Sequence, residues 1–315
     1  MHFAYPPRKD SAPPRFVPRS TQFSTLRRRR LKVVAIIGLA IITFLYLISR
    51  GSSGQGPPRE HVPSGKPPAV IVTVLDESDF RRPYLETVKE NRRQYAERHG
   101  YAVMFPKIGE YDLKGSPFSW TKVVAMRDAM TKFPDAKFIW FLDQDYFIMN
   151  AQATIEEDVM KPTRLESLMI KDHPVVPPDS IIKTFAHLKG QDIDFVLTQD
   201  VEGLSVNSFV IRNGEWARFF LEVWFDPIYR TYNFQKAETH ALEHIVQWHP
   251  TILSRLALIP QNVINAGSTS EKGAQYQPGD MVVRLSNCAK ASNTKPCETE
   301  LEKFTQLWRT AFSGS

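Results

Sequence analysis

The chain beyond its first 32 residues has no excess of positive charge, although the complete sequence carries a formal charge of +6. Residues 1–32 hold nine of the 40 Lys and Arg residues and a single acid, which leaves 31 basic and 33 acidic residues for the rest. A folded part with a net charge of −2 lacks the basic footprint that a nucleic-acid backbone requires. We therefore expect no nucleic-acid partner.

Cysteine is also scarce, since only Cys288 and Cys297 occur among 315 residues. Their spacing of nine would allow a disulfide to close a small loop, and two free buried thiols are the alternative, because sequence does not show geometry. The length and the hydrophobic content of 42% are sufficient for one or two domains with a buried core.

Charge is absent altogether from Val33 to Ser49, a run of 17 residues at the short end of the membrane-spanning range. The long basic segment before it, and the lack of a small-x-small cleavage site after it, favour a signal anchor over a cleaved signal peptide. The basic cluster at 27–32 then places the N-terminus in the cytosol and everything after Arg50 in the lumen. A short span suits a thin early-secretory membrane.

Composition divides the chain into four parts. Residues 1–32 are rich in Pro, Ser and Arg and are predicted to be a disordered cytosolic tail. The anchor occupies 33–49, and residues 50–68, dominated by Gly, Ser and Pro, are predicted to be a stem linker. The lumenal globular domain is expected at 69–315.

The globular part alternates strand-like and helix-like segments. Strands are predicted at 69–75, 101–106, 137–142, 193–200, 206–213 and 279–288, and helices at 80–98, 119–134, 215–225 and 238–250, with Ser119 as the N-cap of the second helix. This order predicts an α/β fold with a parallel sheet covered by helices. Ligands of such sheets bind beyond the carboxyl ends of the strands.

Two aspartates stand at such a strand end, in the stretch "FIWFLDQDYFIMN" (138–150). Carboxylates two residues apart, Asp143 and Asp145, can both reach one divalent cation such as Mn²⁺ or Mg²⁺, which would stabilise a departing diphosphate. A solvated acidic turn is one alternative. Phosphatase chemistry with Asp143 as the nucleophile is another, but that arrangement would place the pair after the first strand.

Several motifs in a fixed order carry a family resemblance: "SWTKVVAMRDAM", "FIWFLDQDYFIMN", "QDVEGLSVNSFVIRN", "HALEHIVQWHP" and "GDMVVRLSNC". Over residues 69–308 the chain resembles glycosyltransferase family 34, the galactosyl/mannosyl/xylosyltransferases. Within the family it looks most similar to fungal Golgi α-1,6-mannosyltransferase subunits of the mannan polymerase complex.

The resemblance implies a GT-A (Rossmann-like) fold, type II Golgi membrane topology, Mn²⁺ dependence and retention of anomeric configuration. It also implies GDP-mannose as the donor, an acceptor glycan on N-linked glycoproteins, and membership of a hetero-oligomeric mannosyltransferase complex.

Site residues carry over by position. Asp143 and Asp145 match the metal-binding D-x-D motif of the family. Lys122 and Arg127 match basic positions of the preceding helix and are expected to face the phosphates of the donor. For both, a solvated helix face is the alternative.

A second group of positions concerns the sugar. Gln199 and Asp200 match the acidic strand end that is a candidate sugar-binding site, and Ser205 lies at the position of a sugar-contacting Asn. Asp200 and Glu238 are the carboxylates expected to stabilise an oxocarbenium-like sugar.

The chain also departs from the family pattern. Ser205 stands where the family has Asn, Asn207 where it has Gly, and Thr239 where it has Gln. Arg284 stands where a His is the usual third metal ligand. An Arg cannot ligate a cation, but it could supply positive charge to the diphosphate. These departures motivate the alternative function, a weakened or inactive structural subunit of a Golgi complex. The intact D-x-D argues against it, because clustered carboxylates are costly to retain without a use.

Overall fold

The computed structural model describes residues 22–51, 61–176, 180–286, 288 and 295–313. The chain divides into two compact units, residues 1–60 and 61–315, which are described separately.

The first unit contains one long helix, α1 (Gln22–Gly51). Within it, 29–47 is the one stretch among the described residues that is long and apolar enough to cross a membrane. The helix begins earlier than the predicted anchor, so residues 22–32 are helical and the prediction of a disordered tail is wrong for them. Arg, Leu and Lys are good helix formers, and the apolar segment that follows allows the helix to propagate into them. Residues 1–21 lie outside the described part.

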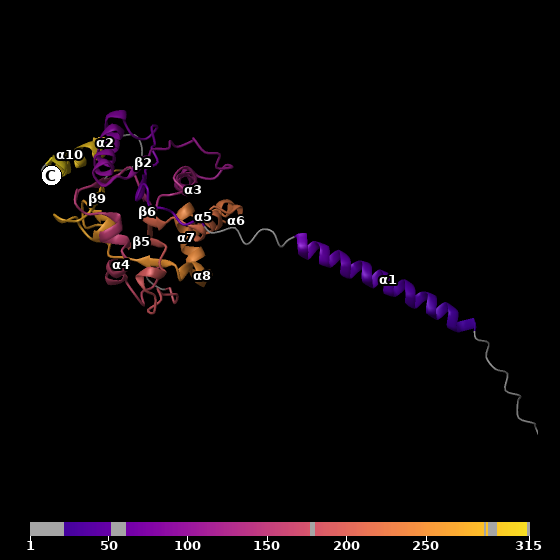
Figure 1. The fold of residues 1–315 in the computed structure, drawn as a ribbon. Helices are drawn as coiled ribbons and strands as arrows, with labels where there is room; N and C mark the ends of the chain where they lie inside the picture. Colours follow the sequence, from indigo (N-terminus) through magenta and orange to yellow (C-terminus); the bar gives the residue numbers. More distant parts are fainter. Residues whose placement is uncertain (1–21, 52–60, 177–179, 287, 289–294, 314–315) are drawn as a thin grey trace, which may run out of the picture. The chain divides into compact units, whose positions relative to one another are not determined.

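The second unit is built on a six-stranded sheet with the order β2-β1-β3-β6-β5-β7. Strands β2, β5 and β6 of this sheet are labelled in Figure 1. The strands are β1 (Ala69–Val72), β2 (Ala102–Met104), β3 (Phe138–Leu142), β5 (Phe195–Asp200), β6 (Gly203–Arg212) and β7 (Leu256–Leu258). The α/β class is thereby confirmed.

The prediction of a parallel sheet is correct only for part of it. β1 pairs in parallel with β2 and β3, and β5 with β7, but β6 runs antiparallel to both β3 and β5. The reason is the connection between β5 and β6: only Val201 and Glu202 join them, and so short a link can form a hairpin but not a crossover. Gly203 follows with φ of +122°, a conformation that favours glycine.

Helices cover both faces of this sheet. On β3, Ile139 and Phe141 pack with the helices of one face, and Trp140 and Leu142 belong to the core of the other face. The first face is covered by η1 (Phe118–Trp120), α3 (Thr121–Lys132), α5 (Glu215–Trp224), α6 (Pro227–Thr231), α7 (Ala237–Trp248) and α8 (Pro250–Leu253). The other face packs against α2 (Arg82–His99), η2 (Glu156–Met160) and α4 (Pro162–Leu168), with η3 (Gly190–Asp192) and α9 (Gln261–Ile264) at its margin.

The predicted helices are present within two residues at each end, but the predicted N-cap is wrong. Ser119 lies inside the 3₁₀ turn η1, and α3 has Trp120 at its N-cap without a side-chain capping bond. The turn continues directly into the helix, so the first amides of α3 are not free to be capped by Ser119.

A second, three-stranded sheet has the order β4-β9-β8 and follows directly on the aspartate pair. It comprises β4 (Tyr146–Ile148), β8 (Ala266–Gly267) and β9 (Val282–Arg284). The strand β9 is shorter than the strand predicted at 279–288. Its start is delayed because Asp280 closes a turn with Gln277 through two hydrogen bonds. Cys288 and Cys297 form a disulfide, which joins the end of this region to the last helix, α10 (Lys295–Ser313).

Candidate active site

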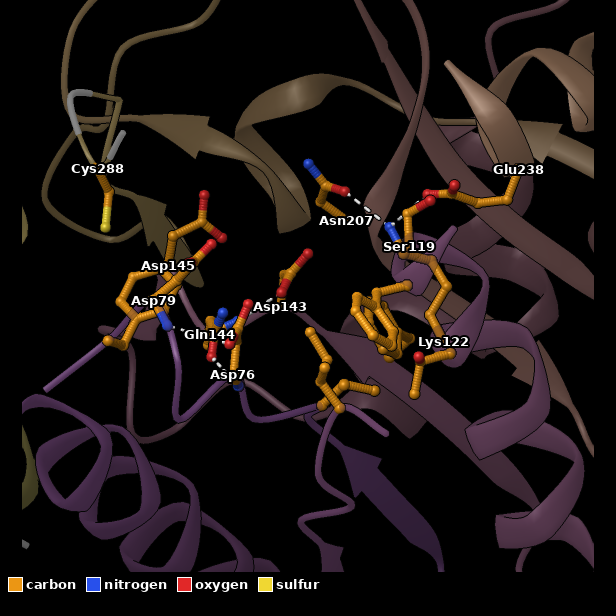
Figure 2. Close-up of a pocket in the computed structure, with 16 residues that line it drawn as sticks. Asp76, Asp79, Ser119, Lys122, Asp143, Gln144, Asp145, Asn207, Glu238 and Cys288 are labelled. Atoms are coloured by element: carbon orange, nitrogen blue, oxygen red, sulfur yellow. Dashed lines mark hydrogen bonds and ion pairs between the residues drawn. The ribbon is translucent and has the colours of Figure 1, made fainter. Parts of the chain in front are cut away.

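A cavity of about 310 Å³ opens at the carboxyl ends of β1 and β3 (Figure 2). Five acids contribute to its lining, together with apolar side chains: Asp76, Asp79, Asp143, Asp145 and Glu238. The position agrees with the rule that α/β sheets bind ligands beyond the carboxyl ends of their parallel strands.

Backbone and side-chain hydrogen bonds fix the segment that carries the aspartate pair. The Asp143 N–H donates to the Asn207 carbonyl at 2.8 Å, and the Asp145 carbonyl accepts from the Leu285 N–H at 2.9 Å. Two bonds of 2.9 Å join Asn91 to the N–H and the carbonyl of Ile148. The two carboxylates are therefore presented by a turn that is held from β6, β9 and α2.

Arg92 of α2 supports the pair from behind. Its guanidinium is fully buried and donates to the Asp143 carbonyl at 2.8 Å and to Asn91 Oδ1 at 3.1 Å. Burial lowers the pKa of Arg92 to about 10, against the opposing effect of Tyr84, Asp145 and Asp143, so the side chain stays charged at neutral pH. The sequence analysis did not single out Arg92. The available signal was a charged residue on the buried stripe of a helix, next to Asn91.

Among the acids that line the cavity, Asp145 has the most strongly shifted pKa. Burial raises its pKa to about 7, with a second contribution from the charge of Asp143 and a lowering effect of Arg284. One of its oxygens, Oδ1, is buried and has no hydrogen-bond partner in the part of the chain that the structure describes. Desolvation and like-charge repulsion both disfavour two adjacent carboxylates, and a bound cation relieves both.

These residues fit a divalent cation that prefers oxygen ligands. The described residues contain no group of three or more His, Cys, Asp or Glu placed to hold a metal. Asp143 and Asp145 would therefore share the cation with ligands from outside the protein. Cations held by one or two carboxylates together with substrate phosphates are common in phosphate-handling enzymes.

Lys122 and Glu238 form a buried ion pair on another wall of the cavity. Lys122 Nζ lies 3.1 Å from Glu238 Oε1 and donates to Asn207 Oδ1 at 3.0 Å and to the Val206 carbonyl at 3.4 Å. Burial would lower the pKa of Lys122, but the charges of Glu238 and Asp143 outweigh it and raise the pKa above its ordinary value. The alternative of a solvated helix face is excluded for Lys122, whose side chain is 8% exposed.

Arg284 and Asp200 pair with each other outside the cavity lining. Arg284 Nη1 lies 3.3 Å from Asp200 Oδ2, and the two side chains are 6% and 9% exposed. Arg284 is opposite Tyr146 in the β4–β9 register, so its charge is close to Asp145 in the fold and lowers the pKa of that carboxyl. Nη2 of Arg284 is buried without a hydrogen-bond partner.

The remaining predicted residues also lie outside the cavity lining. Arg127 of α3 lies 3.6 Å from Glu222 of α5 and is 40% exposed, as expected of a solvated helix face. The Gln199 amide is bonded to His173 and to the carbonyls of Pro174 and Val175. Ser205 is buried in β6, opposite Thr198 of β5. Their predicted roles in donor binding stay predictions.

Two acids of the cavity were missed. Asp76 and Asp79 follow β1 in the stretch "VTVLDESD", and Asp76 Oδ1 accepts from Ser78 and from the Asp79 N–H. Their signal was the same as that of Asp143, an acid directly after an apolar strand. Gln144 connects the two loops, because its Oε1 accepts from the Asp76 N–H at 2.9 Å.

The α/β fold with a D-x-D pair at the ligand edge of its sheet is the arrangement expected of a glycosyltransferase. Comparison with known proteins agrees. The chain belongs to the galactosyl transferase GMA12/MNN10 family, whose sequence model matches residues 65–295.

Three fungal relatives illustrate the similarity. An uncharacterized α-1,2-galactosyltransferase of Schizosaccharomyces pombe is 27% identical over 88% of this chain and 92% of its own length. A second α-1,2-galactosyltransferase of that yeast is 31% identical, over 71% of this chain and 61% of its own length. A protein of Saccharomyces cerevisiae named probable α-1,6-mannosyltransferase MNN10 is 29% identical, over 69% of this chain and 58% of its own length.

The sequence analysis predicted the greatest similarity to mannosyltransferases. Proteins named as galactosyltransferases match this chain at similar identities, so the identities do not distinguish the two activities. The chain also spans less than two thirds of the length of the second and third proteins. Among solved structures, a glycosyltransferase involved in glycosylation of the major capsid of PBCV-1 aligns with a TM-score of 0.49 and 13% identity, over 74% of this chain and 98% of that one.

Proposed function

We propose that this protein transfers a hexose from a nucleotide sugar to a hydroxyl of a glycan, with Asp143 and Asp145 as the cation-binding pair. The observation that supports this most directly is the buried oxygen of Asp145 that has no hydrogen-bond partner, in a cavity lined by acids. A diphosphate carries negative charge, so it binds such a cavity only together with a cation.

The donor we propose is GDP-mannose, and the acceptor an N-linked glycan. Both rest on likeness to the α-1,6-mannosyltransferases MNN10 and MNN11. UDP-galactose is the second candidate, because several relatives are named as α-1,2-galactosyltransferases. The two donors differ in base and in sugar, so direct binding distinguishes them.

The mechanism assigns separate tasks to the two walls. When bound, the cation balances the charge of the departing diphosphate. Arg92 and Asn91 hold the loop of Asp143 and Asp145 in place. Glu238, fixed by Lys122, presents a carboxylate to the positive charge that develops on the sugar. The acceptor hydroxyl attacks C1 of the hexose from the side of the leaving group as the bond from C1 to the diphosphate oxygen breaks, and its proton passes to the departing diphosphate. This front-face path retains the anomeric configuration without an enzymic nucleophile.

Glu238 is favoured over Asp200 for this task. Glu238 lines the cavity, whereas Asp200 does not line it and is paired with Arg284. Both carboxylates are paired with a buried cation, Lys122 for Glu238 and Arg284 for Asp200, so position at the cavity is what favours Glu238.

We further propose that α1 anchors the protein in the Golgi membrane with the second unit in the lumen, and that it acts within a hetero-oligomeric mannosyltransferase complex. The apolar stretch at 29–47 supports the anchor, and the basic residues on its N-terminal side support the orientation.

A weakened or inactive subunit is the second candidate function. The observation that favours it is the state of Lys122, the one cationic side chain among the residues described as lining the cavity, because its three nearest acceptors are all protein groups. A donor would then depend on the metal alone for positive charge.

Turnover distinguishes the two functions. The full-length chain, purified in detergent with Mn²⁺, is assayed with GDP-mannose and UDP-galactose, alone and with its partners. We expect transfer that falls by about a thousandfold in Asp143→Asn/Asp145→Asn. Asp112→Asn is the matched control, because Asp112 is 68% exposed and pairs with Lys114. An unchanged rate in the double variant would overturn the catalytic proposal.

A further inference from the structure

Asn207 is a polar residue of the cavity wall whose backbone and side chain accept hydrogen bonds from different residues. It lies in β6 and lines the cavity between the aspartate pair and the Lys122–Glu238 pair. Its backbone carbonyl accepts from the Asp143 N–H at 2.8 Å, and its side-chain Oδ1 accepts from Lys122 Nζ at 3.0 Å. The residue therefore contacts both walls at once.

The orientation of the Asn207 amide is set by chemistry. A lysine ammonium has three donors and no acceptor, so the amide group that faces Lys122 is the oxygen. The amide nitrogen then points away from Lys122, as Figure 2 shows. Nδ2 has no hydrogen-bond partner among the residues that the structure describes. The amide of a residue that lines the cavity thus keeps two N–H donors for a ligand.

The neighbouring groups indicate what those donors would bind. Glu238 is an acceptor, and its charge is balanced by Lys122. A phosphate on this wall would meet the Glu238 carboxylate without a free cation to compensate. A sugar suits it, since one of its hydroxyls can donate to Glu238 while the oxygen of another accepts from the Asn207 amide.

We propose that Asn207 is a specificity-determining residue that binds a hydroxyl oxygen of the transferred hexose through its side-chain amide, with Lys122 fixing the amide. The proposal rests on the proposed function, because it assigns the sugar to the Glu238 wall and the diphosphate to the aspartate wall. A Gly at 207 would remove the sugar contact and also one acceptor of Lys122.

The test separates sugar from nucleotide. Affinities of GDP and GDP-mannose, and of UDP and UDP-galactose, are measured by titration calorimetry with Mn²⁺ on the full-length chain in detergent. The variants are Asn207→Asp and Asn207→Gly, with Asn233→Asp as the control, because Asn233 is exposed and remote from the cavity lining. Asn207→Asp keeps an oxygen for Lys122, removes the amide donors and adds a negative charge next to the ammonium, so thermal unfolding should stay close to wild type. Asn207→Gly removes the donors without adding charge, so the ratio of affinities is judged first on that variant.

We expect both Asn207 variants to lose about tenfold in affinity for the nucleotide sugar that the wild type binds, and to retain nucleoside diphosphate affinity within about threefold. Equal losses for nucleotide and nucleotide sugar, or no loss for either, would overturn the assignment to the sugar. If Asn207→Asp does not fold, the loss of nucleotide-sugar affinity relative to nucleoside diphosphate affinity is measured on Asn207→Gly alone. A wild type that binds nucleoside diphosphate and nucleotide sugar equally would also overturn it. A wild type that binds neither would overturn the proposed function itself.

Discussion

The two walls of the cavity balance their charges in opposite ways. The aspartate wall keeps two neighbouring carboxylates whose nearest full countercharges, Arg92 and Arg284, are buried behind them and bonded elsewhere. The other wall is neutral within itself, because Lys122 and Glu238 pair directly. Unbalanced charge marks the place where a ligand must supply the opposite charge. An internally neutral wall can instead recognise uncharged groups.

The walls also differ in how they are supported. The Lys122–Glu238 pair stabilises its own wall directly, because the ion pair joins α3 to α7 at the end of the sheet. The aspartate wall depends on supports behind it: Arg92 from α2, and β9, which continues to the disulfide and α10. Changes in the first wall should therefore act on stability, and changes behind the second should act on cation binding.

The largest expected effect is on stability and comes from breaking the buried pair. Lys122→Met leaves Glu238 buried without a countercharge, and should lower the free energy of unfolding by about 3 kcal/mol or more. Lys122→Met/Glu238→Gln should recover much of that loss. Lys132→Met on the same helix is the control, because Lys132 is exposed at its pair with Asp128, so its loss should change stability little. Denaturant unfolding measures all three, and additive losses would contradict the pairing.

The next effect concerns the disulfide. Cys288→Ser/Cys297→Ser opens a loop with a sequence separation of nine and should lower the free energy of unfolding by about 2.5 kcal/mol. Wild type in reducing agent should show the same loss, whereas the double variant should not respond to reductant. A wild type that is insensitive to reductant would show that the two cysteines are free in solution.

A smaller effect tests the support of the aspartate wall. Arg92→Met should weaken Mn²⁺ binding by about tenfold, because it removes the donor that holds the Asp143 carbonyl and so loosens the loop of the aspartate pair. This loss of positioning should outweigh the weaker electrostatic repulsion of the cation once the guanidinium is gone. Arg93→Met is the matched control, one residue along α2 and exposed. Mn²⁺ affinity is measured by electron paramagnetic resonance on the folded variants. If Arg93→Met weakens binding as much as Arg92→Met, the support does not come from the buried side chain.

The sequence predicted the parts of the site that follow from local pattern. An apolar strand followed by two acids placed Asp143 and Asp145 correctly at the ligand edge, and periodicity gave the helices that carry Lys122 and Glu238. Asp200, Gln199 and Arg284 were expected near the donor and lie outside the cavity lining. Their placement depends on an antiparallel β5–β6 hairpin and on β9 pairing with β4, which are long-range pairings that local pattern does not specify.

Arg92 and Asn207 show a second kind of limit. Charged residues are rarely fully buried, so a helix pattern assigns Arg92 to solvent unless its partners are known. Asn207 was noted only as a departure from a family pattern. A role for Asn207 could be proposed only from the structure, which places Lys122 Nζ within hydrogen-bond distance of Asn207 Oδ1.

Cation-dependent donor binding tests the central claim most directly. The full-length chain in detergent is titrated with GDP-mannose and with UDP-galactose, with Mn²⁺ and after its removal by chelator, and the titration is repeated for Asp145→Asn. We predict that one of the two donors binds only with Mn²⁺, that donor and Mn²⁺ raise each other's affinity by the same factor, and that Asp145→Asn removes this coupling. Donor binding of equal strength without a cation, or unchanged coupling in Asp145→Asn, would contradict the assignment of Asp143 and Asp145.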